Sequence, residues 1–493
     1  MKRITNSPPI SCVALLITNL CLTRPIAAAR NVVIYFAAAN RELPSYFALL
    51  RAWLERCNKD HKCKGAITNN SSLPTRVIDI GEASSDLLIL RDSNEIDACS
   101  YVALSHCWGK PQPGDKQRIC THKGNWEERK VGFQVQDLPK TFQDAVEVTR
   151  QLGKRYLWID SLCIVQSLEE GEGTEDWELE SKRMEIVFSS AYCTLAASSA
   201  EGSHEGFLKQ RPSSQPLQIR TEDGDRLYVS KEVDNFVEDM RDAPLNTRGW
   251  VLQERILSRR TIHFGAKQTY FECGEGVYCE NFTHMKSPQR KEYFSMDPQF
   301  PDRLLKAGRI RTLEFIQGLF RDFSQRHLTN ATDRAVAFSG LESRIAKAID
   351  SKSIYGIPER LIHQSLLWQR PEHGKDLSFE GNQENALSAA EVANFMDCEL
   401  KGEGTTDEIS KERAGETEIL KKGGGKIGWI RYDIMEDIPE FDVQRCIVVG
   451  RDWKTYYVLV VNPSSLKDEY TRIGTGAIDC SYLSRIDGKV RVV

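Results

Sequence analysis

Glu180 is a carboxylate at a helix position where an apolar residue is expected. Apolar residues recur at helical spacing over 175–191, which predicts a helix that buries Trp177 and Met184. Glu180 lies three residues after Trp177 and four before Met184, so it shares their stripe. A carboxylate among apolar side chains is costly to ionise unless it is paired or its charge is used. Two interpretations remain: a functional carboxylate, or a structural one that pairs with Arg183 or lies at the stripe's edge.

Polar side chains also stand where two predicted strands end. Ser105 and His106 follow the apolar run 101–104, and Asp160 follows the run 156–159. Open α/β sheets bind ligands beyond the carboxyl ends of their strands. Ser105 and His106 are therefore candidate site residues. The alternative is a satisfied turn residue and a loop imidazole.

A second acid and base, Glu254 and Arg248, belong to the segment 246–255, which predicts the start of another helix. One offers a carboxylate and the other a permanent positive charge. The sequence alone assigns them no role, and we retain them as further candidates.

The pattern Cys57-x-x-x-His61-x-Cys63 combines residue types that bind zinc. A structural zinc site uses four ligands, and no fourth ligand is near in the sequence. Cys273 and Cys279 lack the spacing of a zinc pair. The segment is either a zinc site completed from elsewhere in the chain or a helix end with reduced thiols. The second interpretation is preferred, so the sequence predicts no metal site.

Strands and helices alternate around these candidates. Apolar runs predict buried strands at 101–104, 156–159 and 192–197, and amphipathic segments predict helices at 138–152 and 175–191. This order with short loops is typical of a parallel sheet with flanking helices, so the fold class is α/β. Further strands are predicted as a pair with a turn at Gly81 and as single runs at 261–264 and 269–272.

Length and composition exclude several classes of protein. A chain of 493 residues is too long for one ordinary core, so two or three domains are expected. The sequence is 40% hydrophobic and 28% charged, as in soluble globular proteins. A net charge of −4 does not indicate nucleic-acid or anionic-membrane binding. The scattered cysteines indicate reduced thiols and a cytoplasmic location.

The segments before and after the predicted α/β sheet differ from it in composition and periodicity. Residues 1–30 form a leader with a signal-like layout, so secretion is the alternative location if residues 1–29 are a true signal peptide. Composition and periodicity predict further segments: an N-terminal extension at 31–100, a helical region at 286–375, an acidic, Gly-rich linker at 376–425 and a small β-rich unit at 426–493.

Four blocks resemble the HET (heterokaryon incompatibility) domain of filamentous fungi, and we assign that domain to 101–285. The blocks are YVALSHCWG, LPKTFQDAVEVTRQLGKRYLWIDSLCIVQ, DWELESKRMEIVFSSAYCTLAA and RGWVLQERILSRRTIHF. FSQRHLTNATDRAVAFSGL, LLWQRP and YTRIGTG are similar to the tail of many such proteins. The tryptophan-rich segment that often follows the LLW block is not evident, and the acidic linker stands in its place.

The resemblance implies non-self recognition, a form of innate immunity that ends in programmed cell death. It implies self-association on activation and an incompatibility partner protein. HET domains are thought to be remotely related to TIR domains, which implies a flavodoxin- or TIR-like sheet. Some TIR domains cleave NAD⁺ through the glutamate of a W-x-x-E motif, which Trp177-x-x-Glu180 matches. Glu180 is then the catalytic residue, Ser105 and Asp160 line the nucleotide site, and Trp177 forms its wall.

Two functions follow from the resemblance. In the first, the protein is an effector that cleaves NAD⁺ as a substrate, with no separate cofactor. A carboxylate suits this chemistry, because it stabilises the positive charge that develops on the ribose. In the second, the protein is a non-enzymatic death-signalling module that acts through homotypic assembly, and Glu180 is structural.

Overall fold

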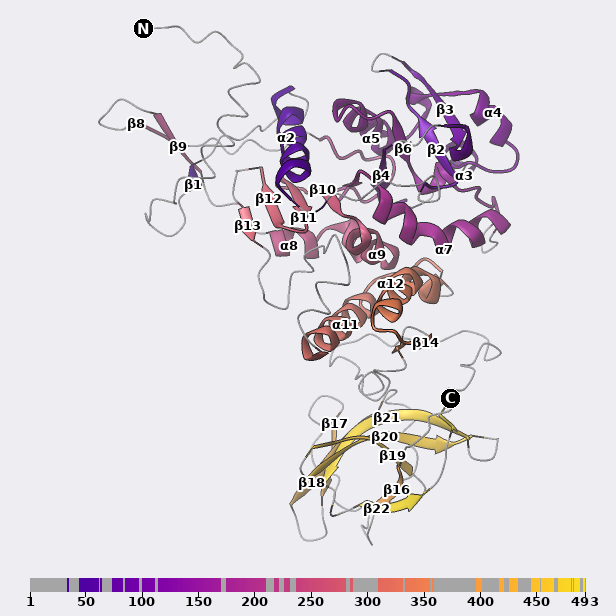
Figure 1. Ribbon diagram of the computed structural model, residues 1–493, viewed down its shortest axis with the longest axis vertical. Helices are drawn as coiled ribbons and strands as arrows, with labels where there is room; N and C mark the ends of the chain where they lie inside the picture. The colour runs from indigo at the N-terminus through magenta and orange to yellow at the C-terminus, as the bar shows by residue number, and fades with distance from the viewer. Residues whose placement is uncertain are drawn as a thin grey trace. The chain divides into compact units, whose positions relative to one another are not determined.

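Four parallel strands form the centre of the main sheet of the computed structural model (Figure 1). In chain order they are β4 (Tyr101–Ser105), β6 (Tyr156–Trp158), β7 (Cys193–Ala196) and β10 (Arg260–Phe264). Their spatial order is β6-β4-β7-β10. The first strand thus lies between the second and the third, which is the order of flavodoxin-like sheets. The carboxyl ends of β4 and β7 form the switch point, where such sheets bind ligands.

Antiparallel strands extend this core on both sides. Among the described residues the sheet has ten strands, in the order β13-β12-β11-β10-β7-β4-β6-β2-β3-β5. One flank consists of β2 (Arg76–Asp79), β3 (Leu87–Asp92) and β5 (Phe133–Gln134). The other consists of β11 (Thr269–Cys273), β12 (Gly276–Cys279) and β13 (His284–Lys286). The predicted α/β sheet with a parallel core is confirmed.

Three helices connect the parallel strands and cover both faces of the sheet (Figure 1). They are α5 (Lys140–Gln151), α7 (Glu175–Ser190) and α9 (Gly249–Leu257). α5 lies on one face, while α7 and α9 pack together on the other, as right-handed crossovers require for this strand order. Thr174 caps α7, because its hydroxyl accepts a hydrogen bond from the Trp177 amide.

The remaining helices are short or lie outside the parallel core. They are α2 (Pro44–Asp60), α3 (Asp115–Ile119), α4 (Trp126–Val131), α6 (Asp160–Cys163), α8 (Phe236–Arg241), α11 (Arg309–Ser324) and α12 (Arg334–Ala348). The 3₁₀ turns are η2 (Ser93–Glu95), η3 (Val135–Asp137) and η4 (Pro244–Thr247). α12 packs against α7 and α9, so the predicted helical region adds to the face that carries α9.

The core of this unit is the sheet itself and the helix faces on it. All residues of β4, β7 and β10 are buried, which explains the apolar residues that dominate β4 and β7. Aromatic side chains fill the space between sheet and helices, and Trp158 packs edge-to-face on Phe188 with centroids 5.6 Å apart. The packing therefore fixes the strand ends, and with them the polar residues that follow.

Residues 1–348 and 349–493 form two compact units. The second contains an antiparallel sheet in the order β17-β18-β21-β20-β19-β16-β22, with β23 paired in parallel to β21, and confirms the predicted β-rich C-terminal unit. Its strands are β16 (Met396–Leu400), β17 (Glu416–Leu420), β18 (Lys426–Tyr432), β19 (Arg445–Asp452), β20 (Thr455–Pro463), β21 (Glu469–Asp479), β22 (Leu483–Asp487) and β23 (Arg491–Val492). Small ladders join β1 (Val33–Ile34), β9 (Arg226–Ser230) and β8 (Leu217–Arg220), and β14 (Ser353–Ile354) with β15 (Ile357–Pro358).

The structure describes residues 33–34, 44–61, 63, 73–82, 85–96, 100–110, 114–169, 174–209, 217–220, 226–230, 236–280, 284–286, 309–330, 333–354, 357–358, 396–400, 416–420, 425–432, 445–452, 454–464, 469–479, 481, 483–487 and 491–492. The predicted leader at 1–30 and most of the predicted linker at 376–425 lie outside them. Within the described part of the chain, no helix is both long and apolar enough to cross a membrane.

Candidate functional site

Ser105, the last residue of β4, faces a carboxyl group contributed by α9. Its hydroxyl donates a hydrogen bond to Oε2 of Glu254 over 2.5 Å. Both side chains are buried, at 3% and 8% exposure. The contact joins residues 149 positions apart, because α9 belongs to the connection from β7 to β10 and packs on the sheet that contains β4. Ser105 thus holds Glu254 at the switch point.

Glu254 is a carboxyl group that exchanges its proton near neutral pH. Burial raises the pKa of Glu254 from 4.5 to about 7, and the hydrogen bond from Ser105 and the charge of Arg248 only partly counter that effect. The Asp160 charge adds to the increase. A carboxyl group with a pKa near 7 can act as a general acid or base, and in its ionised form it can stabilise a developing cation.

His106 and Asp160 lie beside this pair, at the ends of β4 and β6. Nδ1 of His106 is 3.8 Å from Oδ1 of Asp160, and Nε1 of Trp108 donates to Oδ2 of Asp160 over 2.9 Å. Burial lowers the pKa of His106 to about 4, which makes the imidazole neutral at physiological pH. Nε2 of His106 and Oγ of Ser161 are buried and have no hydrogen-bond partner among the described residues. Unpartnered buried polar atoms at a switch point are what a polar ligand would satisfy.

Arg248 supplies the positive charge of this region. Its Nη1 donates to the backbone oxygen of His106 over 2.5 Å, and its charge acts on Glu254. Arg326 donates to the Arg248 carbonyl over 3.3 Å, and the His327 carbonyl accepts from the Gly249 amide over 2.7 Å. The segment after α11 therefore positions the guanidinium.

We call Ser105, His106, Asp160, Arg248 and Glu254 the switch-point cluster. The loops around it are held by a close backbone approach. Gly109 has φ +79, and a Cβ there would lie 2.8 Å from the Cα of Gly202. Any larger residue at position 109 would therefore push apart the loops that follow β4 and β7.

Glu180 lies at the same edge of the sheet but beside β2. Its Oε1 accepts a hydrogen bond from Thr75 Oγ1 over 2.5 Å and pairs with Arg183 Nη1 at 3.2 Å. The register Ile78↔Leu157 places the start of β2, and thus Thr75, at the carboxyl end of β6. The pairing of Glu180 with Arg183 that the sequence left open is therefore present.

The structure brings together some of the predicted site residues and not others. Ser105 and Asp160 belong to the switch-point cluster. Within the described part of the chain, no hydrogen bond or ion pair links Glu180 to that cluster. Trp177 is half-buried and packs edge-to-face on Trp250, one helical turn before Glu254, with centroids 6.3 Å apart. The catalytic role of Glu180 and the binding roles of the other three stay predictions.

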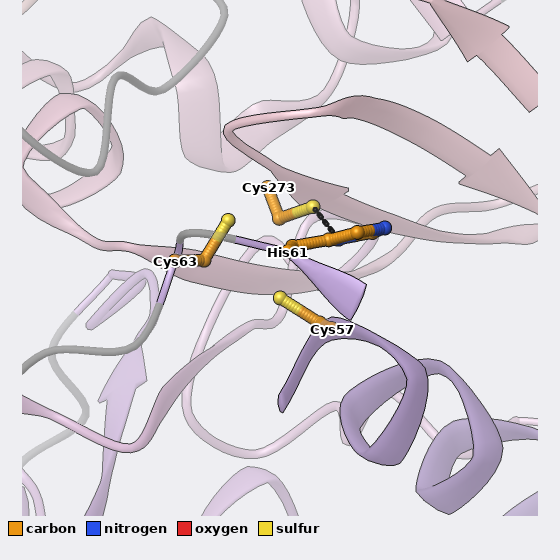
Figure 2. A group of neighbouring side chains, drawn as sticks. All are labelled: Cys57, His61, Cys63 and Cys273. Carbon is orange, nitrogen blue, oxygen red and sulfur yellow. Dashed lines mark hydrogen bonds between the residues drawn. The ribbon is translucent and has the colours of Figure 1, made fainter. Parts of the chain in front are cut away.

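Four further side chains gather at the opposite edge of the sheet, where β11 ends and the parallel strand β10 begins. Cys57, His61, Cys63 and Cys273 offer ligand atoms that all lie within 4.8 Å of one another (Figure 2). The sequence had left open a site completed from elsewhere in the chain, and Cys273 at the end of β11 is the residue that completes the set. We call these residues the cysteine–histidine cluster.

Comparison with known proteins identifies the region that carries the switch-point cluster. Residues 101–254 match the family described as Heterokaryon incompatibility protein (HET). The match begins at the first residue of β4 and ends at Glu254, so it contains every residue of the switch-point cluster. No curated protein and no solved structure matches the chain.

Proposed function

We propose that this chain, whose residues 101–254 form a HET domain, is an incompatibility effector that promotes cell death by hydrolysing NAD⁺ at the switch-point cluster. The HET domain supports the role in heterokaryon incompatibility and cell death. One observation supports the chemistry: burial raises the pKa of Glu254 to about 7 at the point where a doubly wound sheet binds its ligand.

The reaction is hydrolysis of an N-glycosidic bond. The bond between C1′ of the ribose and the nicotinamide nitrogen breaks, and its electron pair leaves with nicotinamide, which loses its positive charge. Water forms the new bond to C1′ and releases one proton, so the products are nicotinamide, ADP-ribose and H⁺. Ionised Glu254 stabilises the oxocarbenium-like transition state and accepts the proton from water.

Other residues of the cluster have supporting roles in this proposal. Ser105 orients the Glu254 carboxyl through their hydrogen bond. The partnerless Nε2 of His106 and the hydroxyl of Ser161 offer polar contacts to ribose or phosphate oxygens. Arg248 offers a guanidinium, which suits a diphosphate. Trp177, on the same face as α9, stays a candidate wall of the nucleotide site.

Activation requires that the cluster become accessible. Ser105, His106 and Glu254 are each less than 9% exposed, so a dinucleotide cannot reach them without a rearrangement. We propose that self-association of the protein in the cytoplasm opens the site. The protein then stays harmless as a monomer and becomes active in the assembled state.

The test follows nicotinamide release from NAD⁺ by chromatography, with the full chain both dilute and under conditions that promote assembly. The wild type is expected to release nicotinamide and ADP-ribose in equal amounts when assembled. Glu254→Gln is expected to abolish release, and the exposed Glu147→Gln serves as a matched control with unchanged activity. Absence of activity in every assembled wild-type sample contradicts the enzyme proposal.

A second function is supported by the contacts of Glu180. The one residue that matches the W-x-x-E pattern is already bound to Thr75 and Arg183, as expected of a structural residue. In this alternative the protein promotes cell death through homotypic assembly and catalyses no reaction. Expression in a fungal host, with viability and NAD⁺ measured together, separates the two: killing by Glu254→Gln without loss of NAD⁺ supports the signalling module.

A further inference from the structure

The cysteine–histidine cluster has the composition of a closed zinc site. We propose that Cys57, His61, Cys63 and Cys273 bind one structural Zn²⁺ ion, which fastens α2 to the end of β11 (Figure 2). Three thiolates and one imidazole form one of the standard ligand sets of structural zinc. All four ligands come from the protein, so no position remains for substrate, and the role is structural.

The distances fit a tetrahedral ion. Zn–S bonds of about 2.3 Å place the sulfur ligands of a tetrahedral site about 3.8 Å apart. The ligand atoms of the cluster all lie within 4.8 Å of one another, so small side-chain adjustments complete the geometry. Figure 2 shows the three sulfur atoms pointing into a common space beside the His61 ring.

Local structure explains how distant residues reach this space. Cys57 lies in the last turn of α2, and His61 follows the helix directly. The His61 amide still donates to the Cys57 carbonyl over 3.3 Å, so this turn places both side chains on one face. Cys63 follows after the helix ends, and Cys273 is the last residue of β11. α2 packs on β11 independently of any ion, since Trp53 stacks on Phe271 with centroids 6.0 Å apart. The ligands are thus held in place before the metal binds.

The hydrogen bonds of His61 leave the correct nitrogen for a metal. Nε2 lies 3.2 Å from the Tyr278 hydroxyl, whereas Nδ1 lies 3.4 Å from Sγ of Cys273. If Nε2 carries the proton and donates it to Tyr278, the lone pair of Nδ1 points at the cluster. Zinc-bound histidines are usually oriented by such a hydrogen bond from the other ring nitrogen.

The surroundings also offset the charge of the complex. Three thiolates and one Zn²⁺ ion carry a net charge of −1, which is costly in a buried site without compensation. Arg260 is 5% exposed and acts electrostatically on Cys57. Its Nε and Nη1 have no hydrogen-bond partner among the described residues. The amide of Gly274 also donates to the sulfur of Cys63. Both groups favour an anionic metal complex at this position.

The competing explanation is a disulfide. Any two of the three cysteines are close enough to be oxidised, which would leave a third thiol and an imidazole without a role. The test therefore measures metal and thiols together. The full chain is purified under reducing conditions without chelator, its zinc is measured by mass spectrometry, and its free thiols are counted after denaturation with and without a chelator.

The expected result is about one zinc ion per chain in the wild type and in the control Cys279→Ser, which changes a buried cysteine on the neighbouring strand. Cys63→Ser and His61→Ala are expected to lose at least ~90% of the zinc. Replacement by Co²⁺ is expected to give the visible spectrum of a tetrahedral, thiolate-rich site. Absence of zinc together with a disulfide among these cysteines overturns the proposal, as does full zinc content in Cys63→Ser.

A measurement on the wild type covers the case in which the variants do not fold. Removing the metal with a strong chelator is expected to lower Tm by roughly 4 °C or more, because an ion that binds only the folded state stabilises it. Adding Zn²⁺ back, but not Mg²⁺, is expected to restore Tm. An unchanged Tm after complete metal removal contradicts the fastening role.

Discussion

Two buried glutamates at the same edge of the sheet, Glu180 and Glu254, show what burial does and does not imply. Glu180 is bound by a hydroxyl and by a guanidinium from its own helix, so its charge is compensated locally. Glu254 is bound by the neutral hydroxyl of Ser105, and burial raises its pKa to about 7. A carboxylate on an apolar stripe is therefore not reactive by virtue of burial. The hydrogen-bond and charge partners of each carboxyl group must be considered together with its burial.

The strongest test of this comparison is the loss of catalysis in two matched variants. Glu254→Gln is expected to lower the rate of NAD⁺ cleavage by at least ~100-fold, because the carboxylate stabilises the transition state and accepts a proton. Glu180→Gln is expected to stay within about threefold of the wild type, since its carboxylate already binds Thr75 and Arg183. Nicotinamide release by the assembled full chain measures both. The reverse order of effects would assign the site to Glu180.

The pH dependence of folding stability tests the state of Glu254 next. A raised pKa in the folded state means that Glu254 stabilises the fold below its unfolded value of 4.5 and that this contribution is lost as pH rises through about 7. Glu254→Gln therefore gains stability relative to the wild type above pH 7, by on the order of 3 kcal/mol. Urea unfolding between pH 5 and 8 measures this gain.

The contribution of His106 to folding stability changes with pH in the opposite direction to that of Glu254. Burial lowers its pKa from 6.5 to about 4, so the stability associated with neutral His106 is lost as pH falls through that window. The slopes of His106 and Glu254 oppose each other between about pH 4.5 and 6.5. Replacing Glu254 with glutamine therefore makes the acid sensitivity of His106 visible in the same unfolding series.

A smaller effect is expected from Ser105→Ala. The Ser105 hydroxyl favours the ionised form of Glu254, so its removal is expected to raise the pKa of Glu254 further. The pH midpoint of NAD⁺ cleavage then moves up by about one unit, since a hydrogen bond to a charged group contributes roughly 1.5 kcal/mol. A pH–rate profile of the assembled protein measures the midpoint. A lower rate with no change in midpoint would show that Ser105 acts by another route.

The smallest effect belongs to the Glu180 pair. The Arg183 side chain is 36% exposed, so water compensates for part of a lost contact. Thr75→Ala and Arg183→Ala are each expected to cost about 1 kcal/mol of unfolding free energy, without changing NAD⁺ cleavage. Chemical unfolding and the cleavage assay test the two statements separately. A large loss of activity in either variant would weaken the contrast between the two glutamates.

The sequence predicted the sheet better than the site. Buried parallel strands are recognisable because both faces are covered and the apolar runs are continuous, and Ser105 and Asp160 were found because each follows such a run. Periodicity singled out Glu180, since α7 has one apolar stripe. It could not single out Glu254, because α9 is buried on nearly all sides and a polar residue there breaks no pattern. The polar residues Gln253, Glu254 and Arg255 within a mainly apolar helix were the available signal.

Long-range contacts explain the rest of what the sequence did not predict. Glu254 meets Ser105 and Cys273 meets His61 through crossovers and strand pairings that no local spacing encodes. Cys57, His61 and Cys63 are close in the sequence and give three of the four ligands. The packing of α2 on β11 brings Cys273 into reach of them. The order β6-β4-β7-β10 brings α9, and with it Glu254, to Ser105.

The pairing of β10 with β7 and of β2 with β6 has a consequence for solubility. Both outer strands lie beyond the limits of the HET match at 101–254. A fragment cut at those limits keeps Ser105 and Glu254 but leaves β6 and β7 as bare, apolar sheet edges, which are templates for aggregation. A fragment spanning residues 44–286 covers both edges with their native neighbours. Self-assembly observed with the shorter fragment would therefore report exposed edges rather than the signalling contact.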